Sequence, residues 1–100
     1  MKKNAKHVSL HTAVLRKKDI TTVDFDGELA LMDVNKGVYY YMDSIGSEIW
    51  GILQTITTTD EIVQQLILQY DIDEETCRNH VLNFIEELID RDLVLILKNI

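Results

Sequence analysis

Between residues 20 and 42, apolar and polar positions alternate in short runs that two turn signals interrupt. The first turn is Asp26-Gly27, a pair of residues that favours a two-residue hairpin. The second is Asn35-Lys36-Gly37, in which glycine accepts a positive φ. The runs are rich in β-branched and aromatic residues, which suit strands. The pattern therefore predicts an antiparallel meander of three strands, at residues 20–25, 28–33 and 38–42.

After residue 42 the apolar positions recur every three or four residues, which is the period of a helix. The pattern predicts three helices, the third ending at about Arg91, and each follows a residue that caps helix N-termini. The expected caps are Asp43 or Ser44, then Thr58 with Glu61 in capping-box spacing, then Asp73. Gly46 weakens the first helix, so we expect it to permit close packing against the sheet.

Two terminal segments are less regular. The segment from His7 to Leu15 suits a further, irregular strand, and Leu93–Leu97 suits either a buried extension or a final strand. Strands that precede helices predict the α+β class. We expect a basic, partly ordered arm at residues 1–18 and a single winged-helix-like domain at residues 19–100, with its three-stranded meander ahead of the three helices.

The net charge and its distribution along the chain exclude some classes of function. The 100 residues carry a formal charge of −7, and residues 1–18 contain lysine and arginine but no acid. An acidic domain repels nucleic acid and tolerates a basic peptide. The longest apolar runs are too short to span a membrane, and the single cysteine, Cys77, fits a reducing compartment. We therefore expect a cytoplasmic protein that binds neither nucleic acid nor a membrane.

Catalytic and metal-binding patterns are weak. Cys77 and His80 are close on the third predicted helix, but Cys77 faces the predicted core, where thiols are usually inert. His7 and His11 are two possible metal ligands without a third. The sequence contains no glycine-rich phosphate loop. We expect no enzyme activity, no metal and no cofactor.

One ordered set of short motifs runs along the chain. The motifs are Asp26-Gly27-Glu28, Leu31-Met32-Asp33, Gly37-Val38-Tyr39-Tyr40, Met42-Asp43, Gly46, Ile49-Trp50, residues 59–63 and residues 88–94. The set resembles the PqqD-like family, also called RiPP recognition elements, and extends over the chain from about Val14. Related sequences usually have Leu-Asn at the position of Met42-Asp43, a swap that keeps one apolar and one capping residue.

The tyrosine-rich third strand and the stand-alone length are most similar to the leader-binding proteins of lasso-peptide biosynthesis. The resemblance implies that a precursor leader peptide adds as a strand beside residues 38–42, in a groove against the third helix. It also implies a leader with a tyrosine and, three residues on, a proline, presented to a leader peptidase or another maturation enzyme. The residues agree in part, because Val38–Met42 has no proline or charge to discourage strand pairing.

On a helical wheel, the predicted core stripe of the third helix is Cys77, Val81, Phe84 and Leu88, and it widens on one side only. We expect Leu82 and Ile89 on that side to form the floor of the groove, unless they pack under Leu93–Leu97. An acidic rim would favour a lysine-bearing leader. The predicted leader-binding residues are Val38, Tyr39, Tyr40, Tyr41, Met42, Glu75, Arg78, Asn79, Leu82, Ile85, Glu86 and Ile89.

Three other readings remain. A winged-helix DNA-binding domain has a similar size, but the third predicted helix is too acidic to approach phosphates. A PqqD-type peptide chaperone for a radical-SAM or other modifying enzyme, and a general protein-interaction adaptor, fit the same features. The uncovered strand edge would also permit a homodimer.

Overall fold

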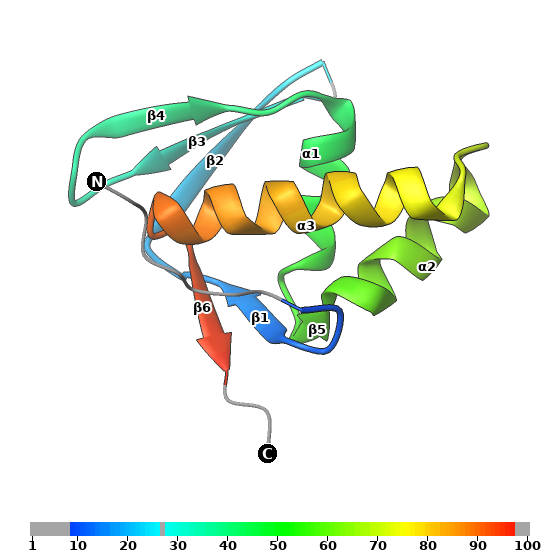
Figure 1. Ribbon diagram of the computed structural model, residues 1–100. Helices are drawn as coiled ribbons and strands as arrows, with labels where there is room; N and C mark the ends of the chain where they lie inside the picture. Colours follow the sequence, from blue (N-terminus) through cyan, green and yellow to red (C-terminus); the bar gives the residue numbers. More distant parts are fainter. Residues whose placement is uncertain (1–8, 27, 98–100) are drawn as a thin grey trace, which may run out of the picture.

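The computed structural model describes residues 9–26 and 28–97, which form two small sheets and three helices (Figure 1). The α+β, winged-helix-like arrangement, with a three-stranded antiparallel meander ahead of the three helices, is confirmed. The elements in chain order are β1 (Ala13–Arg16), β2 (Ile20–Phe25), β3 (Glu28–Asp33), β4 (Val38–Tyr41), α1 (Ser44–Ile52), β5 (Thr57–Thr58), α2 (Thr59–Gln69), α3 (Glu74–Asp90) and β6 (Val94–Leu97).

The meander is the sheet β2-β3-β4, with β3 in the centre and β4 at one edge. Leu31 of β3 is completely buried and lies opposite Tyr40 of β4. The β3–β4 turn is held by Asp33, whose Oδ1 accepts hydrogen bonds from the backbone N–H groups of Asn35 and Lys36 at 3.1 and 3.2 Å. Gly37 follows with a φ of 67°, the positive value that favours glycine.

The second sheet joins the two ends of the described chain in the order β5-β1-β6. Ala13 pairs with Leu97 and Arg16 with Val94, so the expected N-terminal strand and the final strand are both present. Val14 is completely buried. This part of the predicted basic arm is thus packed into the fold. Residues 1–8 lie outside the described residues, and the boundary at residue 18 stays a prediction.

All three predicted helix caps are confirmed. The Oδ1 of Asp43 accepts from the N–H of Gly46 at 2.8 Å, and Thr58 forms a capping box with Glu61. Asp73 accepts from Thr76 at 3.1 Å and begins α3. These bonds satisfy N–H groups that have no partner within the helix, and they set where each helix starts.

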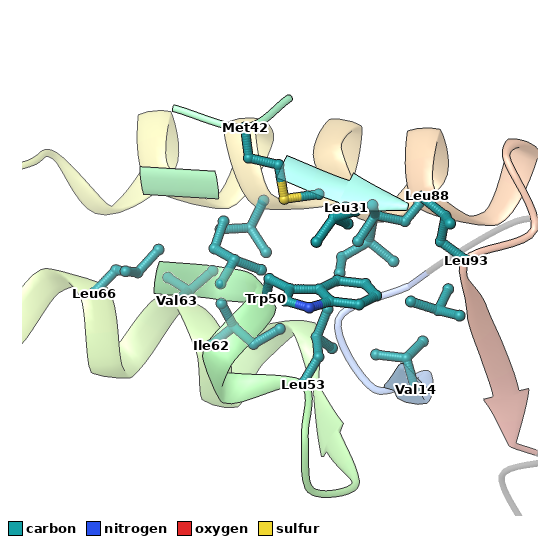
Figure 2. Packing of buried hydrophobic residues seen from close by; sticks show 14 of the residues in the cluster. Val14, Leu31, Met42, Trp50, Leu53, Ile62, Val63, Leu66, Leu88 and Leu93 are labelled. Carbon is teal, nitrogen blue, oxygen red and sulfur yellow. The ribbon is translucent and has the colours of Figure 1, made fainter. Parts of the chain in front are cut away.

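Trp50 of α1 lies at the centre of the hydrophobic core (Figure 2). Its side chain is completely buried, and residues from both sheets and all three helices surround it, among them Val14, Leu31 and Leu88. The Arg16 guanidinium lies 5.3 Å from the indole centroid and donates to the Trp50 carbonyl at 3.1 Å. Because one core supports both β4 and α3, these two elements are held in a fixed relation to each other.

Candidate functional site

The strand β4 forms an edge of the meander. Its antiparallel partner is β3, and no strand among residues 9–26 and 28–97 pairs with its other side. Its sequence, Val38–Tyr41, contains no charged residue or proline, the features that proteins usually place on an exposed edge to prevent pairing. This edge therefore suits the addition of another strand.

The direction of the backbone groups of β4 follows from one hydrogen bond. The N–H of Met42 donates to the Leu29 carbonyl at 2.9 Å, so Met42 faces β3 through its backbone. Backbone groups in an antiparallel ladder alternate in direction, so Tyr40 also bonds toward β3. The N–H and C=O groups of Tyr39 and Tyr41 consequently point to the free edge, where an incoming strand would meet them.

The side chains of β4 alternate between the two faces of the sheet. Tyr40 is half-buried and packs against the core, whereas Tyr39 and Tyr41 are 54% and 76% exposed on the opposite face. Met42 is 8% exposed and belongs to the core (Figure 2). The thioether of Met42 packs inward, and the predicted contact of Met42 with the leader, as part of the strand, stays a prediction.

The C-terminal end of α3 reaches β4 (Figure 1). The Cζ atom of Arg91 lies 4.9 Å from the centroid of the Tyr40 ring. Its guanidinium also forms an ion pair with Glu87, one turn earlier, at 3.0 Å. About two turns before Arg91, Phe84 is partly exposed and packs against the core. We call Phe84, Glu87 and Arg91 the β4-facing flank of α3.

Phe84 also explains Gly46. A Cβ atom built on Gly46 would lie 3.3 Å from the Phe84 ring and 3.2 Å from the capping carboxylate of Asp43. The close approach expected at Gly46 is therefore present, but its partner is α3 and not the sheet.

The predicted groove residues of α3 lie on the other flank. Residues advance by about 100° around a helix, so Leu82 points roughly 160° away from Phe84. Leu82 and Ile89 are partly buried and pack against the core, and Ile85 is completely buried. The buried stripe is Cys77, Val81, Ile85 and Leu88. Ile85 therefore takes the core role predicted for Phe84, and its contact with the leader stays a prediction.

The polar residues of the predicted rim share the flank of Leu82. Arg78 forms an ion pair with Glu74 at 3.0 Å, Glu75 and Asn79 are exposed, and Glu86 is partly exposed. The structure thus brings the β4 residues together but leaves this set on the far side of α3. None of the residues of the β4-facing flank is among the predicted leader-binding residues, and Phe84 was predicted only as part of the core stripe.

A pocket of about 260 Å³ lies between the start of α1, the end of α2 and the first half of α3. Asp43, which follows β4 after one residue, lies at this pocket with Gly46. The remaining lining is mostly apolar, with His80 and Thr76 as polar members: Ile45, Ile49, Leu66, Ile72, Thr76, Cys77, His80, Val81 and Phe84. Such a lining suits an apolar or aromatic side chain.

Cys77 forms part of the pocket wall. Burial of the side chain, and next the nearby negative charge of Glu74, raise the pKa of the thiol above its ordinary value. The thiol is therefore neutral at physiological pH and acts as an apolar wall atom, because only the thiolate is strongly nucleophilic.

Comparison with known protein families identifies the family of this chain. The family described as coenzyme PQQ synthesis protein D (PqqD) matches residues 28–94, which contain β3, β4 and all three helices. The chain belongs to the PqqD family. No curated protein matches its sequence.

Two solved structures have the same fold as this PqqD-family chain. One is of TbiB1 in complex with the TbiA(beta) leader peptide, with a TM-score of 0.76, 24% identity and coverage of 85% of this chain and 99% of that one. The other is of a lasso peptide synthetase B1 complexed with the leader peptide, with a TM-score of 0.72, 16% identity and coverage of 82% and 96%. These likenesses extend the fold assignment beyond residues 28–94.

Within residues 9–26 and 28–97, no three side chains of histidine, cysteine, aspartate or glutamate come together as a metal site. His7, one of the two histidines considered above, lies outside the described residues. None of the helices described is both long enough and apolar enough to cross a membrane.

Proposed function

We propose that this chain binds the leader segment of a precursor peptide, without catalysing a reaction on it, and holds it for a maturation enzyme in the cytoplasm. The observation that carries the proposal is the free edge of β4. There the backbone groups of Tyr39 and Tyr41 point outward beside α3, on a strand without charge or proline. Main-chain pairing at this edge supplies affinity and register.

An added strand would direct every second side chain toward α3. Those side chains would meet the β4-facing flank, where Phe84 offers apolar surface and the Glu87–Arg91 pair offers charge. The pocket near Asp43 and Gly46 would receive one larger anchor, such as tyrosine or proline. Specificity would thus come from the pocket and this flank, in place of the flank of Leu82.

The peptide class is supported by the relatives. The two structures of the same fold are complexes of TbiB1 and of a lasso peptide synthetase B1 with leader peptides. We therefore infer a leader of the lasso type, with a leader peptidase as the enzyme that receives it. The family match, described as coenzyme PQQ synthesis, favours one second candidate, a peptide chaperone for another modifying enzyme such as a radical-SAM protein.

The test is a backbone N-methylation scan. Fluorescence polarisation would measure the binding of a labelled leader peptide from the precursor encoded beside this chain's gene. Each variant peptide would carry one N-methyl group, which removes one N–H donor and leaves the protein unchanged. Strand addition predicts losses of about tenfold at every second residue and small effects between them, because only alternate amides face β4.

The outcome separates pairing from other modes of binding. A helical or side-chain-only mode would lose the period of two. No binding of the unmethylated leader to the folded wild-type protein would contradict leader recognition for that peptide. Binding to a leader from a different peptide class, in parallel titrations, would select the second candidate.

A further inference from the structure

The outer face of the β2-β3-β4 sheet, opposite the core, carries a second surface. The register of the strands places side chains there in two cross-strand rows of three residues, none of them charged. The rows are Val23, Ala30 and Tyr41, then Thr21, Met32 and Tyr39. Phe25 lies beyond Val23 along β2 on the same face, in a further pair with Glu28. We call Val23, Phe25, Tyr39 and Tyr41 the outer-face patch.

The outer-face patch is exposed to a degree that the fold does not require. Val23, Phe25, Tyr39 and Tyr41 are 43%, 56%, 54% and 76% exposed. None of the four belongs to the buried core cluster. Apolar and aromatic side chains gathered on one exposed face mark interaction surfaces.

Strand addition at β4 does not use these side chains either. It uses the backbone groups of Tyr39 and Tyr41, while the inward side chains of the added strand meet α3. The side chains of Tyr39 and Tyr41 therefore need a different partner.

We propose that the outer-face patch docks the enzyme that processes the bound leader. The inference rests on the proposed function. Side chains of a strand alternate between the faces of a sheet, so half of the leader's side chains would stand on the outer face in line with Tyr39 and Tyr41. The patch and those leader side chains would form one continuous surface. The other half of the leader's side chains face α3, so a partner would contact the side chains of the bound leader from the outer face.

The patch also indicates the chemistry of the enzyme's docking surface. The patch itself is uncharged, and Glu28 lies directly opposite Phe25 at one end, with Asp26 beside it in the turn. The chain as a whole carries a charge of −7. The complementary surface is therefore apolar and aromatic, with a lysine or arginine placed to meet Glu28 and Asp26.

Two double variants test the docking. Tyr39→Thr/Tyr41→Thr alters the patch beside the leader, and Val23→Thr/Phe25→Thr alters it in β2, the strand farthest from the free edge. Threonine keeps a high preference for strands. Ile56→Thr/Leu68→Gln is the matched control, because Ile56 and Leu68 are 62% and 86% exposed and lie outside the patch.

Each protein would first be titrated with the labelled leader. The preformed complex would then be titrated against the purified leader peptidase encoded with the precursor, and the rate of leader cleavage would be measured. We expect leader affinity within about twofold of wild type for Val23→Thr/Phe25→Thr and for the control, because neither changes β4, and the titration measures it for each variant. We expect both patch variants, and not the control, to lose at least about tenfold in peptidase affinity and cleavage rate.

Four results would overturn the inference. If the peptidase cleaves the leader at the wild-type rate in complex with both patch variants, docking at the patch is excluded. A large loss of leader affinity in Val23→Thr/Phe25→Thr would assign the patch to the leader site. A wild-type dimer that becomes a monomer in Tyr39→Thr/Tyr41→Thr, measured by sedimentation, would make a second copy of the chain the occupant. Failure of wild type to bind the leader would remove the proposed function itself, and the first titration detects this separately.

Discussion

Arg91, the C-cap residue of α3, stacks its guanidinium on the ring of Tyr40 in the edge strand β4, with its Cζ atom 4.9 Å from the ring centroid. This contact is a direct link between the helix and the strand that we propose to bind the leader. It also shows which flank of α3 faces β4.

The Arg91–Tyr40 contact predicts a measurable coupling. In a double-mutant cycle of Arg91→Met and Tyr40→Leu, followed by urea unfolding, we expect a coupling free energy of about 0.5–1 kcal/mol, typical of a partly exposed cation–π pair. Arg91→Met also removes the ion pair with Glu87, but the cycle cancels that effect. A coupling near zero would mean that the two groups meet without attraction.

The two flanks of α3 give opposite predictions for leader binding. Phe84→Ala, on the β4-facing flank, should weaken leader binding by about tenfold or more. The change removes an apolar side chain from this flank and from the wall of the pocket. Leu82→Ala, on the other flank, should change the affinity by less than about twofold. Fluorescence polarisation measures both after circular dichroism confirms folding. The reverse order would restore the groove predicted from the sequence.

The alternation of backbone groups in β4 predicts a difference between neighbouring proline variants. Tyr41→Pro removes an N–H that points to the free edge, where proline is tolerated, so the protein should fold but lose leader binding. Tyr40→Pro removes an N–H bonded toward β3 and should unfold the meander. Tyr41→Thr, which keeps the N–H, should bind the leader as wild type does. Thermal unfolding and polarisation separate these cases, and a folded Tyr40→Pro would contradict the assigned alternation.

Gly46 and Gly51 form a matched pair in α1. Alanine at Gly51 has nothing within 4 Å and should gain about 0.5–1 kcal/mol from helix preference. Alanine at Gly46 meets the Phe84 ring and the Asp43 carboxylate. We expect Gly46→Ala to be at least about 1 kcal/mol less stable than Gly51→Ala in urea unfolding. Equal stability of the two variants would mean that the Phe84 ring moves aside without a loss of folding free energy.

The buried thiol of Cys77 makes stability depend on alkaline pH. Its folded pKa is raised above the ordinary value of 9.0, mainly by burial. As pH rises past 9.0, the unfolded chain releases this proton first, so stability falls, by at most about 1.4 kcal/mol per pH unit. We expect the free energy of unfolding of wild type to decline relative to Cys77→Ala between pH 8 and 10. Parallel pH curves would show that the folded pKa is not raised.

Much of the fold was predictable because its signals are local. The turns at Asp26 and Gly37 delimit the three strands of the meander, and the side chains of Asp43, Thr58 and Asp73 begin the helices where they were expected. Such signals depend on residues three or four positions apart, so they are present in the sequence itself.

The orientation of α3 was not predictable in the same way. Phe84 and Ile85 are adjacent and both apolar, so the hydrophobic pattern allows the centre of the buried stripe to lie under either one. The choice depends on where β4 and α1 pack. Gly46 did signal a close approach, but nothing local names Phe84 as its partner. The same reasoning applies to β1, whose pairing with β6 joins residues about 80 positions apart.

That pairing has a consequence for how the protein is made. β1 leaves the ribosome first and its partner β6 last, so the second sheet closes only when nearly all the described chain is available. The β2-β3-β4 meander needs only contacts between neighbouring strands, and contacts of this kind form fastest. The unpaired edge of β4 would therefore form early on the nascent chain, before the hydrophobic core is complete. If the chain binds a leader as we propose, β4 would be open to pairing with it before the core is complete.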